Sequence, residues 1–561
     1  MNQNNIEKFF FKIGQHSFLI ALAVMFSFPF IWMIAASGKV DREMFGEQRT
    51  LFPRAPKPAL ISPYTDVNAF PEPSKPEEIN QEDYDRLKES LSSVIYSAVT
   101  NANILLPERF RDNAEKEITQ GLWKRLIAIT PYSYWTNLAL NPEKIAERAT
   151  RKKEIKEILN QCYRKFSIRL SRVRDDDMTV YNLEMGKPVT SIWSSLNPEA
   201  AFLEEQNDQS LPYADIHYSF EKTNEIDFQA EFDIPFAASN LLQFCIAYRP
   251  DDSWHRMYVE VEGGGKKYVS TEAVYLFDYT WSGVNWQKPS EQDAEIKIKR
   301  WTKMKLADEG KQFDFGKKKI RVKLILKQSS LLQAWIGKLS RNYLSTFKYV
   351  PFWRYIGTSA FLVILNIIGT LFSSTVVAYA FSRLRWPGRD VFFLLLLATL
   401  MIPPQVTLIP GFIIMKWLGW YNTLQPLWVF SFCGNAFYIF LLRQFMKGIP
   451  NDLEDAAKID GCGFLRIYWY VVLPLIKPTM AAIAIFTFMG VWNDFMGPLI
   501  FLSDHRLYPL SLGLFSLNVQ AGGNFGMMMA GSFLMTLPVI IIFFFAQKYF
   551  IQGITLTGMK G

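Results

Sequence analysis

The sequence predicts a polytopic α-helical membrane protein that carries a large α+β domain outside the cytoplasm. Three observations predict this class. The 561 residues are 49% hydrophobic and 15% aromatic, yet the mean hydropathy is only +0.03, because long apolar runs and one long polar stretch cancel in the average. The polar stretch, about residues 39–345, follows the first apolar run. Basic residues gather in the short connections between the other runs, as they do on the cytoplasmic side of membranes.

Six apolar runs are long enough to span a membrane, since about 20 residues cross the hydrocarbon. They cover residues 17–36, 357–381, 391–413, 424–444, 479–501 and 527–547. Pro403-Pro404 predicts a kink in the third run, which neighbouring helices can tolerate. The first run could instead be a cleaved signal peptide, because Ala35-Ala36-Ser37 stands at its end. Its length and its place in the topology favour a span.

Lysines and arginines give the orientation of these spans. They lie before the first run, between the second and third, between the fourth and fifth, and after the sixth, all on one side of a six-span topology. The residues are Lys8, Lys12, Arg383, Arg385, Arg389, Arg443, Lys447, Lys458, Arg466, Lys477, Lys548 and Lys560. Both termini are therefore expected in the cytoplasm and residues 39–345 outside it. The net charge of +8 needs no nucleic-acid partner to explain it.

The first half of the inserted stretch changes character along the chain. Residues 39–79 contain seven prolines and predict a stiff linker rather than a packed element. Residues 80–166 predict helices, because apolar side chains such as Leu87, Leu91 and Ile95 recur at helical spacing.

The second half of the insert, residues 167–330, predicts strands. Apolar residues alternate with polar ones, as at Phe228, Ala230 and Phe232. Several such runs separated by Gly and Asp turns are typical of a β-sandwich or jelly roll.

The most informative segment is Leu453–Pro474, called here the signature segment. Pro450 ends the preceding helix, and Asn451 can cap the next one with Glu454 as its capping-box partner. Gly461 supplies a positive-φ turn after that helix. An ordinary surface helix–turn–helix between two spans is the alternative interpretation.

The signature segment resembles the E-A-A-x3-G-x9-I-x-L-P sequence of permease subunits in ATP-binding-cassette (ABC) importers. Asp455 replaces the usual Glu, and Val471 replaces Ile. The residues that this resemblance assigns to ATPase coupling are Glu454, Asp455, Ala456, Ala457, Asp460, Gly461, Leu473 and Pro474. The segments Val377–Leu384 and Trp492–Phe495 extend the resemblance to carbohydrate permeases of the maltose-transport G-subunit type. It covers residues 1–50 and about 340–561, and the large insert is the main departure.

The resemblance implies a type I importer permease fold formed by residues 1–38 and 340–561, in a bacterial or archaeal plasma membrane. Residues 452–460 would form the coupling helix. The implied partners are a second related permease, two ATPase subunits, an extracytoplasmic solute-binding protein and membrane lipid. The implied cargo is a sugar or oligosaccharide, and the chain itself would not be an enzyme.

The sequence contains none of the common catalytic motifs, as expected for a subunit that is not an enzyme. A phosphate-binding loop needs G-x-x-x-x-G-K followed by Ser or Thr, whereas Gly263-Gly264-Gly265-Lys266-Lys267 lacks both the upstream Gly and the hydroxyl. That stretch predicts a hairpin turn instead. The four histidines lack metal-ligand spacing, and no G-x-S-x-G elbow is present. We therefore expect no catalytic residue, metal or cofactor, and ATP hydrolysis must come from a partner.

Two sets of residues could contact the cargo. Trp492, Asn493, Asp494 and Phe495 stand deep in the fifth run, where a carboxylate is costly unless it faces protein or a water-filled path. They would line the sugar route or, alternatively, hold neighbouring helices together. In the insert, Trp254, Trp281 and Trp286 could stack on sugars, although aromatic residues in strands more often belong to a core.

Several questions stay open at this stage. Cys162 and Cys245 are both in the insert and could form a disulfide. The cargo could be a polyol or a glycerol phosphate conjugate rather than a sugar. A different class of protein, a membrane-anchored glycan-binding receptor, would have spans but no use for an ATPase-docking helix, so the signature segment argues against it.

Overall fold

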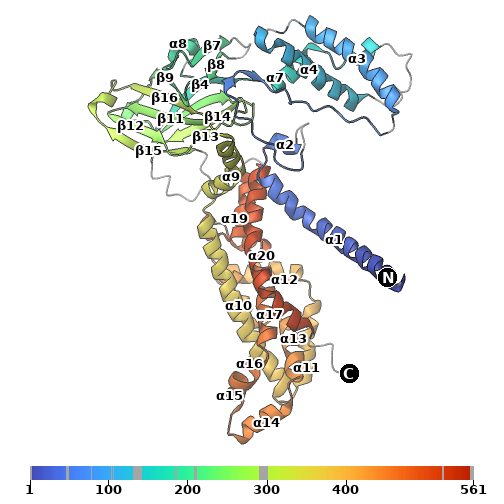
Figure 1. Cartoon of the computed structure of the whole chain (residues 1–561). Coiled ribbons are helices and arrows are strands. Elements are labelled where there is room, and N and C mark those ends of the chain that lie inside the picture. Colours follow the sequence, from blue (N-terminus) through green and yellow to red (C-terminus); the bar gives the residue numbers. More distant parts are fainter. Residues whose placement is uncertain are drawn as a thin grey trace. The chain divides into compact units, whose positions relative to one another are not determined.

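The computed structural model describes residues 3–45, 50–77, 79–102, 104, 106–130, 142–183, 186–206, 211–289, 301–520 and 524–555. The chain divides into two compact units, whose elements are labelled in Figure 1. The helical unit contains the residues up to Gly38 and those from Asn342 onward. The inserted unit contains Lys39–Glu295 and Arg300–Arg341.

The helical unit consists of one long N-terminal helix and a bundle in the C-terminal part of the chain. Its described α-helices are α1 (Gln3–Ser37), α10 (Phe352–Arg383), α11 (Arg389–Ala398), α12 (Pro404–Trp417), α13 (Ala436–Lys447), α14 (Asn451–Ile459), α15 (Phe464–Ile467), α16 (Leu473–Leu475), α17 (Lys477–Trp492), α18 (Met496–Phe501), α19 (Leu510–Gln520) and α20 (Phe525–Thr555). α9 (Leu331–Tyr349) leads into this unit from the insert.

The bundle is organised around α10, which packs against α13, α17 and α19. The buried side of α10 carries small and hydroxyl residues, which let helices approach closely in a membrane. Polar side chains also link it to its neighbours: the Asn366 amide donates to the carbonyl of Leu427 at 3.0 Å, and the Ser373 hydroxyl donates to the carbonyl of Ser431 at 2.9 Å.

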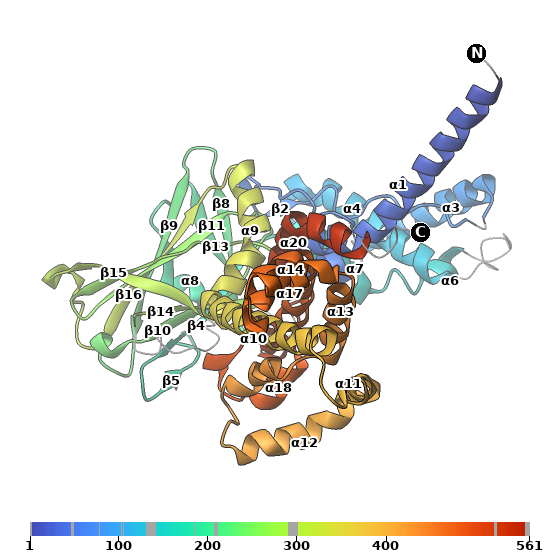
Figure 2. The ribbon, with the colours of Figure 1, turned by 90° about the horizontal axis from the view of Figure 1, so that it is seen from below.

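The structure supports between four and six membrane spans, where the sequence predicts six. Four helices in the described part are long and apolar enough to cross a membrane, and there are up to six spans if each of two bent helix pairs counts as one. The bends measure 100° between Arg389–Met401 and Gln405–Trp417, and 75° between Phe464–Leu475 and Lys477–Trp492. Figure 2 shows α11 and α12 as two separate rods.

Proline and polar residues cause these interruptions. Pro403 and Pro404 cannot donate main-chain hydrogen bonds, so the third apolar run breaks there instead of being kinked as predicted. The predicted fifth span, 479–501, also ends early, because α17 stops at Trp492 and α18 starts at Met496.

The first part of the inserted unit is a helical layer. Its helices are α3 (Gln81–Asn101), α4 (Glu108–Ile129), α6 (Pro142–Ala146) and α7 (Lys152–Cys162), preceded in the chain by the short α2 (Asp41–Phe45). Asn80 caps α3 by accepting from the main-chain N–H of Glu82. Leu87, Leu91 and Ile95 are buried in the core of this layer, where α3 packs against α4 and α6, as their spacing predicts.

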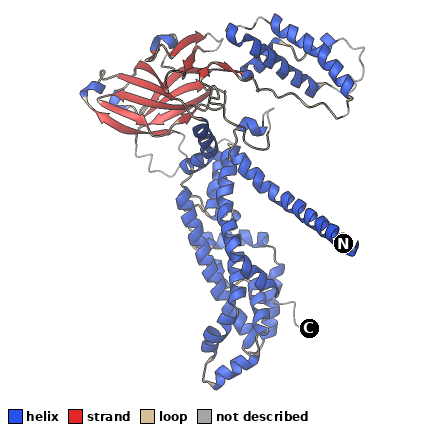
Figure 3. Ribbon diagram, in the orientation of Figure 1, coloured by secondary structure: helices blue, strands red, loops and turns tan. Residues whose placement is uncertain are grey.

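The second part of the inserted unit is β-rich, and Figure 3 shows its strands gathered apart from the helical layer. A 14-stranded sheet has the central order β1-β8-β4-β10-β14-β15-β12-β11-β16-β9-β6. The strands are β1 (Ile61–Ser62), β4 (Phe166–Arg174), β5 (Thr179–Val180), β6 (Trp193–Ser195), β7 (Ala201–Gln206), β8 (Tyr213–Ser219), β9 (Glu225–Asp233), β10 (Gln243–Arg249), β11 (Arg256–Gly263), β12 (Lys266–Ser270), β13 (Val274–Tyr275), β14 (Ser282–Gln287), β15 (Thr302–Glu309) and β16 (Lys319–Lys327). β2 (Tyr64–Thr65) and β3 (Tyr163–Arg164) pair separately.

The sheet curves around a single apolar core. Ile168 and Ile246 from one half of the strand order share that core with Phe228, Val259 and Leu324 from the other half. The alternation predicted at β9 is present, with every second side chain buried. The expected sandwich or jelly roll is therefore a β-rich unit whose two halves are joined through the parallel pair β14–β15.

The Pro-rich segment is packed, so the prediction of a simple linker is wrong. β1 pairs with β8, and β2 pairs with β3. Phe70 is only 1% exposed and belongs to the core of the helical layer. Proline fixes φ without preventing a chain from running along a sheet edge, which is how these short strands add to larger elements.

Acidification is expected to destabilise the inserted unit through His255. Its Nε2 lies 2.7 Å from the carbonyl of Ala59, and its Nδ1 accepts from the N–H of Ser329, so the ring is held neutral. Burial lowers the pKa of His255 below its usual 6.5, against the opposing effect of Asp251. The unfolded chain then binds a proton that the folded chain does not, and the free energy of unfolding falls as pH drops below about 6.5.

Urea unfolding of the full chain in detergent, followed by amide exchange in β11 and β16 at pH values from about 7.5 to 5.5, measures this effect. The variant His255→Asn lacks the titrating ring and should show a shallower dependence on pH. An unchanged slope in the variant would assign the pH dependence to other groups.

Candidate functional site

The signature segment forms a helix that ends in a tight glycine turn. α14 follows Pro450, and its C-terminal end is closed by main-chain bonds from Gly461 to Lys458 and from Cys462 to Ala457. Gly461 has φ +78°, the left-handed conformation that glycine adopts without strain. The predicted positive-φ turn is therefore confirmed.

The predicted capping box at the start of α14 is wrong. The helix begins at Asn451 itself, and the capping position is taken by Pro450, which offers no side-chain acceptor. The Asn451 side-chain oxygen instead accepts from the Arg383 guanidinium at 2.5 Å, and the Glu454 carboxylate lies 3.0 Å from Arg383 Nε. A charged partner from another helix has drawn both side chains away from the main chain.

Arg383 therefore holds three chain segments at one point. It is the last residue of α10, and its guanidinium also donates to the carbonyls of Met446 and Ile449. The side chains of Arg383 and Glu454 are only 6% and 8% exposed. The end of α10, the end of α13 and the start of α14 are thus fixed together, while the C-terminal end of α14 is exposed.

The tip of the signature segment is exposed and partly apolar. Ile459 is 87% exposed, and Phe464 and Leu465 are 58% and 62% exposed. These three residues are not in the predicted coupling set, whose exposed members are Asp455, Ala456, Asp460, Gly461 and Pro474. Large apolar side chains gathered at the tip of a helical hairpin are typical of a protein interaction surface.

The second half of the signature segment is tied back to α10. The Tyr379 hydroxyl donates to the carbonyl of Phe464 at 3.1 Å, and the Thr375 and Tyr468 hydroxyls lie 2.8 Å apart. A single π-helical turn, Tyr468–Val472, precedes α16, which contains Leu473 and Pro474. The structure thus ties both halves of the signature segment to α10, at Glu454 and at Phe464 and Tyr468.

The four residues predicted to line the sugar route lie at the break between α17 and α18. Trp492 is buried, and its indole N–H donates to the carbonyl of Met535 in α20 at 3.0 Å, so the helix-packing interpretation describes this residue. Phe495 packs against Phe515, with ring centroids 4.6 Å apart. The Asp494 carboxylate accepts from the main chain of Gly497 and so begins α18.

Asn493 is the exposed member of that set. Its side-chain N–H donates to the carbonyl of Met489 one turn earlier, at 2.9 Å. The side-chain oxygen takes no part in that bond and can accept another.

Two of the three tryptophans proposed for sugar stacking in the insert are core residues. Trp254 is 1% exposed and Trp286 is 0% exposed, so the stacking prediction is wrong for both. Trp286 points inward because its register on β14 places it opposite Phe244 of β10. Trp281, which precedes β14, is 37% exposed.

Other predicted features of the insert resolve simply. Gly264 and Gly265 both have positive φ and join β11 to β12, so the glycine run is the predicted hairpin turn. Cys162 and Cys245 are free thiols in separate parts of the insert. Within the described ranges, no group of three or more His, Cys, Asp or Glu residues could hold a metal ion.

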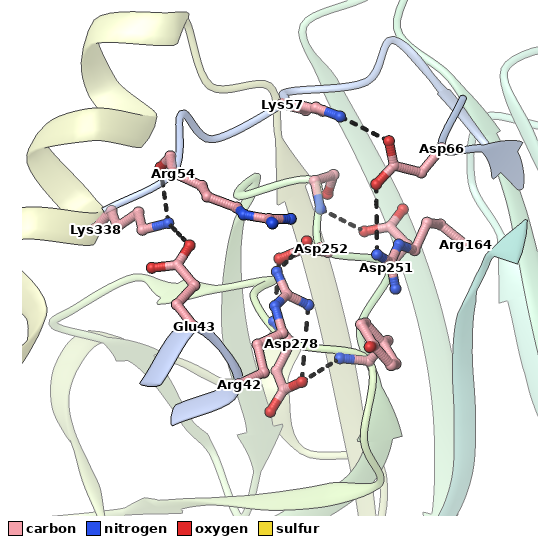
Figure 4. Close-up of polar contacts among 12 residues, drawn as sticks. Arg42, Glu43, Arg54, Lys57, Asp66, Arg164, Asp251, Asp252, Asp278 and Lys338 are labelled. Atoms are coloured by element: carbon pink, nitrogen blue, oxygen red, sulfur yellow. Dashed lines mark hydrogen bonds and ion pairs between the residues drawn. The ribbon is translucent and has the colours of Figure 1, made fainter. Parts of the chain in front are cut away.

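The inserted unit also contains a charged cluster that the sequence did not predict, shown in Figure 4. Lys338 of α9 pairs with Glu43 of α2 and donates to the carbonyl of Arg54 at 2.9 Å. Arg42 pairs with Asp252. These residues line a pocket of about 350 Å³.

The cluster joins the first and last segments of the inserted unit. Asp66 completes it, with Lys57 at 2.7 Å and Arg164 at 3.5 Å. Most of these charges neutralise one another, so we interpret the cluster as a structural one that fastens the two ends of the inserted unit together. The only sequence signal was the presence of charged residues next to apolar ones at both ends of the insert.

Comparison with known proteins places the helical unit in a family. Residues 370–556 match the family described as "Binding-protein-dependent transport system inner membrane component". The arabinooligosaccharides transport system permease protein AraQ of Halalkalibacterium halodurans is 36% identical over 210 residues, which cover 37% of this chain and 75% of the relative. The galactooligosaccharides transport system permease protein GanQ of Bacillus subtilis is 36% identical over 201 residues, covering 35% and 71%.

A solved structure of a bacterial ABC transporter involved in the import of the acidic polysaccharide alginate contains a chain that is 27% identical to this one. The similarity covers 37% of this chain and 79% of that chain, with a TM-score of 0.33.

Proposed function

Because the chain belongs to the family of binding-protein-dependent transport system inner membrane components, we propose that it forms half of the membrane path of an ATP-driven sugar or oligosaccharide importer. The prediction of a carbohydrate-type ABC transporter permease, a subunit that is not itself an enzyme, is confirmed by that membership. The match leaves the inserted unit uncovered, since it begins at residue 370.

The proposed assembly is that of a type I importer. A second related permease completes the path, two ATPase subunits bind on the cytoplasmic side, and a solute-binding protein delivers the cargo from outside. The basic connections between the apolar runs support an orientation with both termini in the cytoplasm and the inserted unit outside.

The signature segment is the proposed contact with the ATPase. The observation that carries this proposal is its construction: a buried arginine anchors the base of α14, while an apolar tip is left exposed. A helix held in this way can transmit a displacement of its tip to α10, whose last residue is Arg383. The exposed Ile459 gives the ATPase surface an apolar anchor.

The cargo is proposed to be an oligosaccharide because the relatives named for arabinooligosaccharide and galactooligosaccharide transport match the helical unit. Asn493 is the member of the predicted pathway set that we assign to the cargo, because its amide is exposed at the break between α17 and α18. A polyol or glycerol phosphate conjugate is the alternative cargo, and a glycan-binding receptor is the alternative class.

Replacing Gly461 with aspartate is expected to separate the permease from its ATPase. A Cβ at position 461 meets no atom within 4 Å, but the positive φ of this turn strains any residue other than glycine. The change therefore places both that strain and a charged side chain at the tip of the segment, away from the bundle. Native purification of the tagged chain from gently solubilised membranes, with quantification of the co-purified ATPase, measures the effect. We expect a loss of about tenfold in recovered ATPase, equivalent to about 1.4 kcal/mol of binding.

Gly419→Asp is the matched control, since Gly419 has φ +73° and equally open surroundings but lies outside the signature segment. The control should retain the ATPase. Equal recovery with Gly461→Asp would count against the assignment of the signature segment. Absence of any ATPase with the wild type would favour the receptor class.

A further inference from the structure

One face of the β-rich part carries basic and aromatic side chains side by side. In β4, β8, β10 and β14, the residues that alternate with the buried ones point away from the core. Strand register places Cys245 of β10 between Arg172 and Asn285, and Ser167 opposite Asp215. We call this surface the basic–aromatic face, formed by Lys165, Arg169, Arg172, Tyr181, Tyr213, Trp281 and Asn285.

The aromatic rings of this face form a platform with cations on it. Trp281 and Tyr213 meet edge to face, with centroids 5.5 Å apart and planes at 77°. The Arg169 guanidinium lies 5.1 Å from the centre of the Trp281 ring, and the Lys165 ammonium lies 5.2 Å from that of Tyr213. Trp281 remains 37% exposed, and Tyr181, with Arg172 over its ring, is 64% exposed.

The polar groups of the face have a definite charge balance. Register places two carboxylates among them, Asp215 opposite Ser167 and Glu204 opposite Asp215. Asp215 is already bonded to Lys165 at 2.7 Å and to the Ser167 hydroxyl at 2.6 Å, and Glu204 lies 2.8 Å from Nε2 of His217. The Arg172 guanidinium donates to the Asn285 side-chain oxygen at 2.6 Å, a neutral partner that leaves its charge uncompensated. Among the described residues, the three cations Lys165, Arg169 and Arg172 therefore outnumber these two carboxylates, and they lie next to exposed ring surface.

We propose that the basic–aromatic face binds an acidic oligosaccharide, one whose sugars carry carboxylates. Ring faces of Trp and Tyr pack on the apolar faces of sugars, and their polar edges suit wet, hydroxyl-rich ligands. Planar guanidinium groups recognise carboxylates through paired hydrogen bonds. The combination suits neither a neutral sugar, which leaves the charge unused, nor an apolar protein surface, which would bury the cations.

This site goes beyond the proposed function, because it lies on the inserted unit and binds without ATP hydrolysis. Its measured affinity is therefore independent of whether the helical unit transports a sugar. If the chain recovered its ATPase partners normally but the basic–aromatic face bound no acidic sugar, only the proposed binding site would be refuted, and the proposed transport function would stand.

The test uses the purified full chain in lipid nanodiscs. Binding of oligogalacturonate, in which every sugar carries a carboxylate, is compared with binding of maltooligosaccharide of equal length and of oligoglutamate of equal charge. We expect the acidic sugar to bind at least about tenfold more tightly than either, and its affinity to fall as NaCl is raised from about 50 to about 500 mM. Equal affinity for all three probes, or for the two sugars, would overturn the proposal.

Substitutions locate the site. Trp281→Ala and Arg169→Ala are each expected to weaken oligogalacturonate binding by about tenfold, and Trp281→Phe should retain most of it. The matched controls lie elsewhere in the inserted unit: Tyr96→Ala removes another exposed ring in α3, and Arg321→Ala removes another arginine in β16. Wild-type affinity in the Trp281 and Arg169 variants, or an equal loss in the controls, would show that the sugar binds elsewhere.

Discussion

Replacing Arg383 with alanine is expected to abolish uptake and to loosen α14 while the chain stays in the membrane. The change removes the charged partner of Glu454 and the donor to Asn451, Met446 and Ile449. Breaking a buried pair by removing one member costs about 3–5 kcal/mol, because the remaining charge is left uncompensated. α14 is only nine residues long, and a helix that short is not stable without tertiary support.

Two measurements separate the local effect from its consequence. Amide exchange across residues 449–460 reports release of α14, and uptake of labelled oligosaccharide by cells carrying the whole transporter reports function. Arg385→Ala is the matched control, since Arg385 lies two residues away and its side chain is exposed. It should leave both exchange and uptake close to wild type.

The double variant Arg383→Met, Glu454→Met sharpens the test. If the ion pair acts only as an anchor, two apolar side chains of similar length should restore part of the protection from exchange, since replacing both members of a buried pair is often neutral. Rapid exchange in the control, or full protection in Arg383→Ala, would refute the anchoring role.

The features of this site that could be predicted are those that depend on residues close together in the sequence. The helix, its glycine turn and the later Leu473-Pro474 follow from local sequence, because helix propensity and positive φ are decided by near neighbours. The role of Glu454 could not be predicted in this way. Its partner Arg383 is 71 positions earlier, and a buried charge prefers that long-range partner to the local capping bond.

The spans show the same division. Length and composition correctly indicate apolar helices, but they do not reveal where polar residues or prolines divide one run into two helices. At Pro403-Pro404 the loss of two main-chain donors is decisive. At Asn493 and Asp494 the polar side chains bond to their own chain and end one helix before the next begins.

The insert was the least predictable region, for a physical reason. Alternation along a strand identifies two faces but not which one meets the core, so Trp286 and Trp281 could not be distinguished until the register of β14 was known. The packing of the Pro-rich segment depends on β8 and β3, which are distant in sequence.

Replacing Glu43 with glutamine is expected to destabilise the inserted unit by about 3–5 kcal/mol at neutral pH, since it leaves the buried Lys338 ammonium without its paired carboxylate. Both side chains are only 2% exposed. Besides Glu43, Lys338 has the Arg54 carbonyl at 2.9 Å and the ring of Trp254 at 5.4 Å, which carry no negative charge. Asp252 also acts on Lys338, but it is already paired with Arg42. Denaturant unfolding of the full chain, read through amide exchange in β11 and β16, measures the loss.

The pH dependence of this loss identifies its cause. Burial lowers the pKa of Lys338, and Glu43 opposes that effect in the wild type. Without Glu43 the folded state sheds the Lys338 proton more readily, whereas the unfolded chain keeps it up to about pH 10.4. The unfolded state then binds more protons, so the free energy of unfolding of Glu43→Gln should rise with pH and approach the wild-type value. Glu225→Gln, which breaks the exposed pair with Lys327, should cost far less and show no such recovery. A deficit in Glu43→Gln that is constant with pH would mean that lost packing, rather than an uncompensated charge, closes the two ends of the unit.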